Sequence, residues 1–266
     1  MDTVVKSAKR VTEVFEFFAE RRASASARDI HVALGYPQSS TSVLLHSLVS
    51  GGYLIYDPRS RLFQPTMRIA LLGSWMLESR ATGGGALLSI MQDLGDSTGD
   101  TILLSVQKSI HILYIQVIQA SRSVRFYMKP GSLRPICQTS SGHALLSLKS
   151  PSEISSLVSR ANVEREEDQP LISRTDLLSK IELGMEAGYF VTYETATAGA
   201  GAVAMPIAKL SNHPPLALGI GAPVDRLKSK LDEYVSALRG AMQRLEEGAE
   251  PLRMHSVKAA DQAASR

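Results

Sequence analysis

Apolar residues near the beginning of the chain recur at the spacing of an α-helix in three short segments. The first starts at about Ser7, whose hydroxyl can cap a helix N-terminus. The second starts at Ser26 and Asp29, which fit a capping box, and Gly35 suits its end. The third starts near Ser39. These segments predict three helices, whose inner faces carry Val11, Val14, Phe15 and Phe18, then Ile30, Ala33 and Leu34, then Thr41, Leu44, Leu45 and Leu48.

The second and third helices are separated by residues 35–38 alone, and two short helices joined by a tight glycine-containing turn are typical of a helix-turn-helix. Residues 53–56 and 62–64 have the character of two strands joined by a turn at 57–61. This hairpin has the position of a wing. The pattern therefore predicts a winged helix-turn-helix DNA-binding domain over residues 1–65.

The remaining pattern predicts a linker and a second, larger domain. An apolar-rich helix at 66–79 and a glycine-rich stretch ending at Gly85 form the linker, over residues 66–85. Strands are expected at 101–107, 110–119, 123–128, 189–194, 202–208 and 216–221. Helices are expected near 140–148, 151–162 and 175–188, with a long closing helix that carries Leu227, Leu231, Tyr234, Leu238 and Leu245. We therefore expect an α+β domain with one antiparallel sheet over 86–250 and a flexible tail over 251–266.

Composition narrows the class of protein. Of the 266 residues 44% are apolar and 21% are charged, which indicates a globular and not a disordered chain. No apolar run reaches the ~18 residues that a membrane span needs, and the N-terminus lacks the apolar stretch of a secretory signal. The one cysteine, Cys137, cannot form an internal disulfide, which fits a reducing cytoplasm. We expect a cytoplasmic protein with no membrane partner.

The positive charge is confined to the beginning of the chain. Residues 1–80 contain 10 Lys/Arg and 7 Asp/Glu, whereas residues 81–266 contain 19 of each, so the net charge of +3 belongs to the predicted DNA-binding domain. This mild bias supports binding to nucleic acid without requiring it.

Motifs typical of enzymes lie in the wrong structural context. Gly95-Asp-Ser97-Thr-Gly99 matches the G-x-S-x-G string of serine hydrolases, but a helix precedes it and a strand follows, which is the reverse of the hydrolase order. Gly199 to Ala204 resembles a dinucleotide-binding string, yet a strand containing Pro206 follows where a helix is required. The six histidines and Cys137 have no paired ligand spacing. We expect no catalysis, no cofactor and no metal, with a serine hydrolase as a remote alternative.

Short strings through nearly the whole chain occur in a fixed order. In the first domain they are Ser7-x-x-Arg10, Asp29-Ile30, Leu34-Gly-Tyr-Pro-Gln-Ser39, Leu48-Val-x-x-Gly-Tyr53 and Asp57-Pro58. In the second they are Leu94-x-x-x-Thr-Gly99, Gly131-x-x-x-Pro135, Thr139-x-x-Gly-x-Ala-Leu-Leu146, Gly188-Tyr189, Glu194, Gly199 and Val203-Ala-x-Pro206. This ordered set resembles the IclR family of bacterial transcriptional regulators. The resemblance implies a winged helix-turn-helix domain, a GAF-like effector-binding domain, and dimers or tetramers on palindromic operators.

The third helix and the wing supply the candidate DNA contacts. The first turns of a recognition helix meet base edges in the major groove, where Gln binds adenine, Ser binds bases or phosphates, and Val contacts a thymine methyl group. Arginines on a wing suit phosphates or the minor groove. The candidates are Arg28, Gln38, Ser39, Ser40, Ser42, Val43, His46, Arg59 and Arg61. The same serines also suit a solvated helix start, and the same arginines a solvated turn.

The resemblance places an effector pocket against the sheet of the second domain. It implies lining by Thr139, Ser140, Ser141, Thr192, Glu194, Ala200, Ala202, Gly219 and Gly221. Phe126 and Met128 on the expected strand at 123–128 can add an apolar wall, and His143 follows a turn that can hold a carboxylate. An alternative is that His143 is a capped surface histidine.

Departures from the family bear on the DNA contacts and on the effector. Val43 stands where Arg is usual, His143 where Lys is usual, and Ala202 where Cys is usual. Relatives that bind small carboxylates tend to carry Asp, Cys and two Ser where this chain has Thr192, Ala202, Gly219 and Gly221. The smaller side chains predict a larger, less polar pocket and an effector such as an aromatic acid or a catabolic intermediate. They equally suit close packing of strands.

Two classes of function remain open at this point. The first is a DNA-binding transcriptional regulator that responds to a small-molecule effector and acts on double-stranded operator DNA as a homodimer or tetramer. The second is a ligand-binding or oligomerisation protein whose N-terminal module docks another protein. Steeply salt-dependent binding to promoter DNA distinguishes the first from the second.

Overall fold

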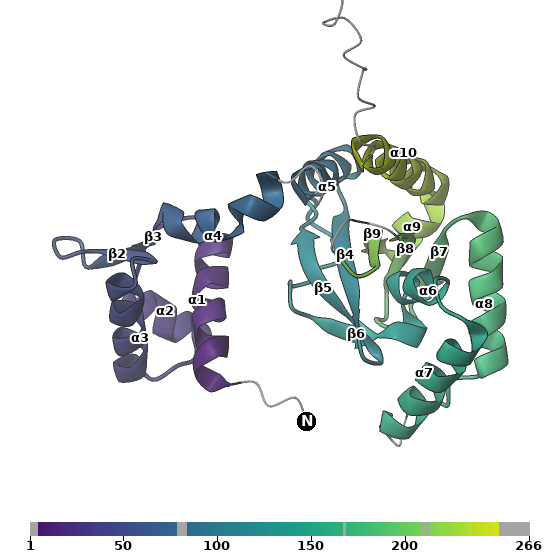
Figure 1. Cartoon of the computed structure of the whole chain (residues 1–266), viewed down its shortest axis with the longest axis horizontal. Coiled ribbons are helices and arrows are strands. Elements are labelled where there is room, and N and C mark those ends of the chain that lie inside the picture. Colours follow the sequence, from purple (N-terminus) through teal and green to yellow (C-terminus); the bar gives the residue numbers. More distant parts are fainter. Residues whose placement is uncertain (1–4, 79–83, 167–168, 209, 211–212, 250–266) are drawn as a thin grey trace, which may run out of the picture. The chain divides into compact units, whose positions relative to one another are not determined.

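The computed structural model describes residues 5–78, 84–166, 169–208, 210 and 213–249 (Figure 1). The chain divides into two compact units, residues 1–78 and 79–266. Residues 79–83 of the expected linker and the whole expected tail lie outside the described residues. The domain boundaries expected at residues 65 and 85 stay predictions.

The N-terminal unit is a three-helix module with a small sheet. Its elements are α1 (Lys6–Arg21), β1 (Ala25–Ser26), α2 (Ala27–Leu34), α3 (Gln38–Ser50), β2 (Leu54–Asp57), β3 (Leu62–Pro65) and α4 (Met67–Glu78). The strands pair antiparallel in the order β1-β3-β2. One core joins the three helices to the hairpin, and its buried members are Val14, Phe18, Ala25, Ile30, Leu45, Leu48, Leu54 and Phe63. The predicted winged helix-turn-helix architecture is thus present.

Local signals account for most of these boundaries. The Ser26 hydroxyl accepts a hydrogen bond from the Asp29 amide at 3.2 Å and the Asp29 carboxylate accepts from the Ser26 amide at 3.0 Å, which completes the predicted capping box. Gly35 ends α2 in the left-handed region with φ 68°. The predicted cap at Ser7 is wrong, because α1 starts at Lys6 and its N-cap, Val5, has no side-chain hydrogen bond. Sequence analysis also missed the two-residue strand β1.

The C-terminal unit is built around one six-stranded antiparallel sheet in the order β6-β5-β4-β9-β8-β7. Its first half consists of α5 (Gly84–Thr98), β4 (Thr101–Lys108), β5 (His111–Ile118), β6 (Leu133–Pro135), the 3-10 helix η1 (Ile136–Gln138) and α6 (Ser140–Leu146). Its second half consists of α7 (Pro151–Glu164), α8 (Arg174–Ala187), β7 (Phe190–Tyr193), β8 (Ala200–Ile207), β9 (Leu216–Pro223), α9 (Val224–Ser229) and α10 (Leu231–Ala249).

Both faces of the sheet are covered, so its strands alternate between two cores. Ile102 and Val203 point to a core with Tyr234 and Leu238 of α10. The neighbouring Leu103 and Ala204 point to a second core that includes residues of α6, α7 and α8. Figure 1 shows α5 and α10 on one side of the sheet and α6 and α8 on the other.

Two predicted elements differ from the structure. No strand forms at 123–128, because the carbonyls of Val124, Phe126 and Met128 accept hydrogen bonds from side chains and not from a neighbouring strand. The edge partner of β5 is β6 instead. The predicted closing helix is interrupted at Lys230, whose backbone is not helical, so Leu227 belongs to α9 and the other predicted residues to α10.

Candidate functional sites

The outer face of α3 presents several of the predicted DNA contacts. Gln38 and Ser39 are exposed at its first turn, and Val43 is 68% exposed one turn further on. Ser42 is half-buried beside them. These side chains can meet base edges when the first turns of α3 enter the major groove.

The other two predicted residues on α3 have partners within the module. The Ser40 hydroxyl donates to the carbonyl of Pro37 at 3.1 Å and accepts from Arg10 at 3.4 Å. The exposed ring of His46 packs edge-on against Tyr56 and Phe63, with ring centroids 5.4 and 5.5 Å apart. Ser40 and His46 therefore fix α3 to its surroundings in addition to any contact with DNA.

Arg10 is a cation beside the start of α3 that is not among the DNA contacts predicted from the sequence. Its guanidinium lies over the Tyr36 ring, 4.7 Å from the centroid, and donates to Ser40. The Tyr36 hydroxyl donates a hydrogen bond to Glu13 of α1. This bond fixes the Tyr36 ring, and with it the position of the Arg10 guanidinium, against α1. A positive charge held at this end of α3 suits a phosphate of bound DNA.

The wing is a turn held by its own aspartate. The Asp57 carboxylate accepts hydrogen bonds from the Arg59 amide at 3.0 Å and from the Ser60 hydroxyl at 2.5 Å. These bonds, the Ser60 hydroxyl first, hold the pKa of Asp57 below its usual range. Arg59 and Arg61 are exposed on the turn, and Arg28 is exposed at the start of α2. Figure 1 shows the β2–β3 hairpin projecting beyond the helices of this unit.

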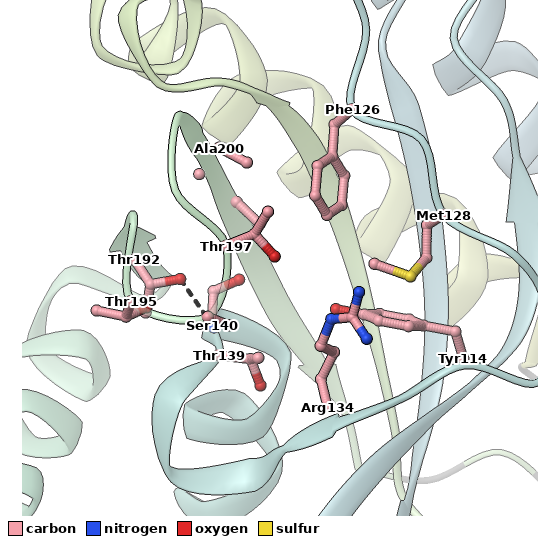
Figure 2. Close-up of a pocket in the computed structure, with 13 residues that line it drawn as sticks. Tyr114, Phe126, Met128, Arg134, Thr139, Ser140, Thr192, Thr195, Thr197 and Ala200 are labelled. Atoms are coloured by element: carbon pink, nitrogen blue, oxygen red, sulfur yellow. Dashed lines mark hydrogen bonds between the residues drawn. The ribbon is translucent and has the colours of Figure 1, made fainter. Parts of the chain in front are cut away.

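The C-terminal unit contains a recess on the α6 side of its sheet, with a volume of about 360 Å³ including its open mouth (Figure 2). The recess combines apolar and polar side chains, as sites for small organic molecules commonly do. The walls come from β5, the loop 119–132, β6, the start of α6, β7, the turn 194–199 and β8. The lining residues are Tyr114, Phe126, Met128, Arg134, Thr139, Ser140, Thr192, Thr195, Ala196, Thr197, Ala200, Gly201 and Ala202.

Seven residues of the predicted effector site line this recess. They are Phe126, Met128, Thr139, Ser140, Thr192, Ala200 and Ala202. Thr139 caps α6 by accepting from the Gly142 amide at 3.1 Å, and the Ser140 amide donates to the Thr192 hydroxyl at 3.2 Å. These bonds join the start of α6 to β7 and keep one wall of the recess in place.

Five residues of the predicted effector site do not line the recess. Three of these five belong to α6 or to the turn 194–199. Ser141 and His143 are buried in α6, and the His143 Nε2 lies 2.9 Å from the carbonyl oxygen of Cys137. The predicted alternative of a surface histidine is therefore wrong. Glu194 has a positive φ of 55° and accepts from the Gly199 amide at 2.9 Å, which closes the turn 194–199.

Gly219 and Gly221, the other two, lie on the recess side of the sheet but are covered. A Cβ atom at Gly221 would lie 2.7 Å from Cδ1 of Phe126, and one at Gly219 would lie 2.9 Å from the carbonyl oxygen of Val203. The expectation that these glycines enlarge the pocket is thus wrong. The space left at Gly221 is occupied by the Phe126 ring, which itself forms a wall.

Sequence analysis missed six lining residues: Tyr114, Arg134, Thr195, Ala196, Thr197 and Gly201. Arg134 adds the one charged group to the lining. The signal that could have found it is the short apolar-flanked run Leu133–Pro135 after Gly131, which forms β6. The strand-like pattern at 123–128 predicts a strand there instead. Sequence analysis therefore assigns no strand to residues 133–135 and does not find Arg134.

Burial favours the neutral forms of Tyr114, which lines the recess, and of Cys137 in the neighbouring η1. It raises the pKa of Tyr114 to about 12 and that of Cys137 to about 11. At neutral pH neither side chain offers a phenolate or thiolate nucleophile. Ser97 of the hydrolase-like string lies in the last turns of α5, where its hydroxyl donates to the carbonyl of Leu94 at 3.2 Å.

Burial also lowers the pKa of His143 below its ordinary value of 6.5, and this predicts a pH dependence of stability. The unfolded chain takes up a proton near pH 6.5, whereas the buried ring resists it until lower pH. The stabilisation is therefore complete above about pH 6.5 and is lost as the pH falls through the folded pKa. We expect urea unfolding to show a smaller loss of stability between about pH 7.5 and 5 in His143→Asn than in the wild type.

The matched control for this prediction is His213→Asn, because His213 is exposed. This variant should keep the wild-type pH dependence. An unchanged dependence in His143→Asn would contradict the prediction.

A winged three-helix module followed by an α+β unit with a recess on its sheet is the architecture of a DNA-binding regulator with an effector-binding domain. Two family models match the chain: the IclR helix-turn-helix domain at residues 7–58 and the C-terminal domain of bacterial transcriptional regulator IclR at residues 86–247. The chain therefore belongs to the IclR family of transcriptional regulators, as its motifs predict.

Individual relatives support this assignment. The regulator XynR of Escherichia coli is 23% identical over 209 residues, which cover 77% of this chain and 81% of XynR. The acetate operon repressor of Salmonella typhimurium is 25% identical over 240 residues, 90% of this chain and 86% of that protein. The effector domain of an IclR regulator from Acinetobacter sp. ADP1 superposes with a TM-score of 0.59 at 26% identity, covering 64% of this chain and 99% of that one.

Family membership confirms the predicted function at the level of class. The protein is a DNA-binding transcriptional regulator with an effector-binding C-terminal domain. No helix within the described residues combines the length and the apolar character that a membrane crossing requires.

Proposed function

We propose that the protein represses transcription by binding operator DNA as a homodimer or tetramer, and that a small organic acid in the recess controls this binding. In this proposal the first turns of α3 enter the major groove while Arg59 and Arg61 of the wing contact phosphates or the minor groove. The names of relatives such as the acetate operon repressor support repression, and DNA binding supports a place in the cytoplasm.

The observation that carries the effector proposal is the recess itself. An aromatic and apolar side formed by Tyr114, Phe126 and Met128 faces a side rich in hydroxyl groups from Thr139, Ser140 and Thr192. A ligand with a flat apolar body and polar substituents matches both sides. An aromatic acid fits this description better than an acid of two or three carbons.

The test combines DNA binding with a ligand screen. We expect the protein to bind the DNA upstream of its own gene with a steep salt dependence, and an aromatic acid to change that affinity. A thermal-shift screen should find larger stabilisation by benzoate or 4-hydroxybenzoate than by glyoxylate or pyruvate.

The two parts of the proposal fail separately. Salt-independent binding, or no binding, to the upstream DNA would favour docking to a protein instead. Tight binding of glyoxylate or pyruvate without any response to aromatic acids would overturn the effector class alone.

A further inference from the structure

Arg134 brings a positive charge into the recess without an acidic partner. Its Nη1 donates to the carbonyl of the adjacent Leu133 at 3.0 Å, and across the described part of the chain no carboxylate forms an ion pair with it. Arg134 is half-buried on β6, opposite Ile112 of β5. Its charge acts on the Tyr114 hydroxyl, where it opposes the rise in pKa that burial causes. A partly desolvated guanidinium with free donors is a binding group for a carboxylate.

Ser140 is a second polar group that lacks a partner. The residue is 1% exposed, and among the described residues nothing forms a hydrogen bond with its hydroxyl oxygen. Figure 2 shows this hydroxyl directed toward the recess from the start of α6, with Arg134 on another wall. A buried hydroxyl without a hydrogen bond is destabilising, so a ligand that bonds it recovers the loss.

Arg134 and Ser140 face the same recess, which also has an aromatic and apolar side. Phe126 and Met128 come from the loop 119–132, and Tyr114 comes from β5. A molecule that spans the recess from Arg134 to Ser140 is therefore bordered by these side chains. Its shape has an anionic group at one position, a hydrogen-bonding group at another, and a flat or apolar body between them.

We infer that Arg134 and Ser140 together select the effector: Arg134 binds its carboxylate and Ser140 bonds a second polar substituent. This inference rests on the proposed function, because it specifies the ligand class of the same recess. It predicts that the charge of the ligand, and not its size alone, decides binding.

The test compares an acid with its neutral amide. Isothermal titration of 4-hydroxybenzoate and 4-hydroxybenzamide into the wild-type full chain should show much tighter binding of the acid. Arg134→Met keeps an unbranched side chain and should weaken binding of the acid about 10- to 100-fold, the effect of losing a hydrogen bond to a charged group. Arg134→Lys, which keeps the charge, should lose less.

Ser140→Ala gives a second readout. It should weaken binding of 4-hydroxybenzoate but not of benzoate, which has no second polar group. In the absence of ligand it should raise or preserve the unfolding temperature, because it removes a buried hydroxyl that has no partner. A ligand-free protein that is clearly destabilised by Ser140→Ala would contradict the unpartnered state of this hydroxyl and overturn its assigned role.

Arg160→Met on α7 is the matched control, because it removes the same charge from an exposed arginine that donates to Ser109 and does not line the recess. It should leave binding unchanged. Equal affinity of the wild type for acid and amide, equal affinity of Arg134→Met and the wild type for the acid, or no binding of either probe would overturn the inference. The proposed function would survive any of these results if operator binding responds to another small molecule.

Discussion

Replacing Arg226 with methionine is expected to lower the free energy of unfolding of the C-terminal unit by about 3–5 kcal/mol, the usual effect of breaking a buried ion pair. Asp100 is fully buried, and Nη1 of Arg226 lies 2.5 Å from its Oδ1. The Tyr234 hydroxyl donates to Oδ2 at 2.6 Å. Without Arg226 the carboxylate loses its closest counter-ion and remains in a site closed to water.

Arg122 provides the matched control, since it faces the same carboxylate at longer range. Its Nε lies 3.8 Å from Oδ2 of Asp100 and its side chain is 44% exposed, against 22% for Arg226. An exposed, loosely paired arginine contributes little, so Arg122→Met should cost no more than about 1 kcal/mol. Urea unfolding followed by circular dichroism measures both. Equal losses for the two variants would show that the ion pair at 2.5 Å is not the dominant interaction of Asp100.

The same substitution should loosen a wall of the recess. Nη2 of Arg226 donates to the carbonyl of Val124 at 3.1 Å, and the Thr101 hydroxyl donates to the carbonyl of Phe126 two residues on. The loop that carries Phe126 is therefore attached to α9 and to the start of β4 by side chains alone. Limited trypsin digestion should cleave after Arg125 faster in Arg226→Met than in the wild type, at a temperature where both remain folded.

The fold of the N-terminal unit can be predicted from the sequence because the residues that define its helix ends and turns are close to one another in the chain. The capping box at Ser26 and Asp29, the left-handed Gly35 and the Asp57 turn each involve residues within a few positions of one another. Each therefore predicts its element without knowledge of the rest of the fold. Even here β1 was missed, because two residues become a strand only by pairing with the distant β3.

The recess was predicted less completely because its walls meet through long-range contacts. The motif around Thr139 and Ser140 is local and was found. The covering of Gly221 by Phe126 depends on a loop that crosses β9 from a distant part of the chain, and no pattern in either segment reveals it. Arg134 was missed for the same reason, since its place in the recess follows from the pairing of β6 with β5.

The expected effect of removing both wing arginines, Arg59→Ala with Arg61→Ala, is a decrease in operator affinity on the order of 100-fold at about 0.1 M salt. The helix α3, Gln38–Ser50, contains no Lys or Arg, so the contacts proposed for it involve neither of these cations. The proposed function therefore assigns the phosphate contacts to the wing and to cations such as Arg10 and Arg28. In a plot of the logarithm of affinity against the logarithm of salt concentration, the slope should become shallower. The change should be roughly 1 for each phosphate contact that is lost, counted over all bound subunits.

This effect can be separated from a folding defect. Across the described residues, the side chains of Arg59 and Arg61 form no ion pair and no hydrogen bond. The turn is stabilised instead by hydrogen bonds to Asp57. The double variant should therefore have the same free energy of unfolding as the wild type. Arg21→Ala with Arg22→Ala removes the same charge from the end of α1, which is not among the proposed contacts, and should change affinity much less. Equal decreases in the two double variants would mean that the overall charge of the domain, and not the wing, provides the attraction to DNA. A decrease in affinity with an unchanged salt slope would instead place the wing arginines on base edges.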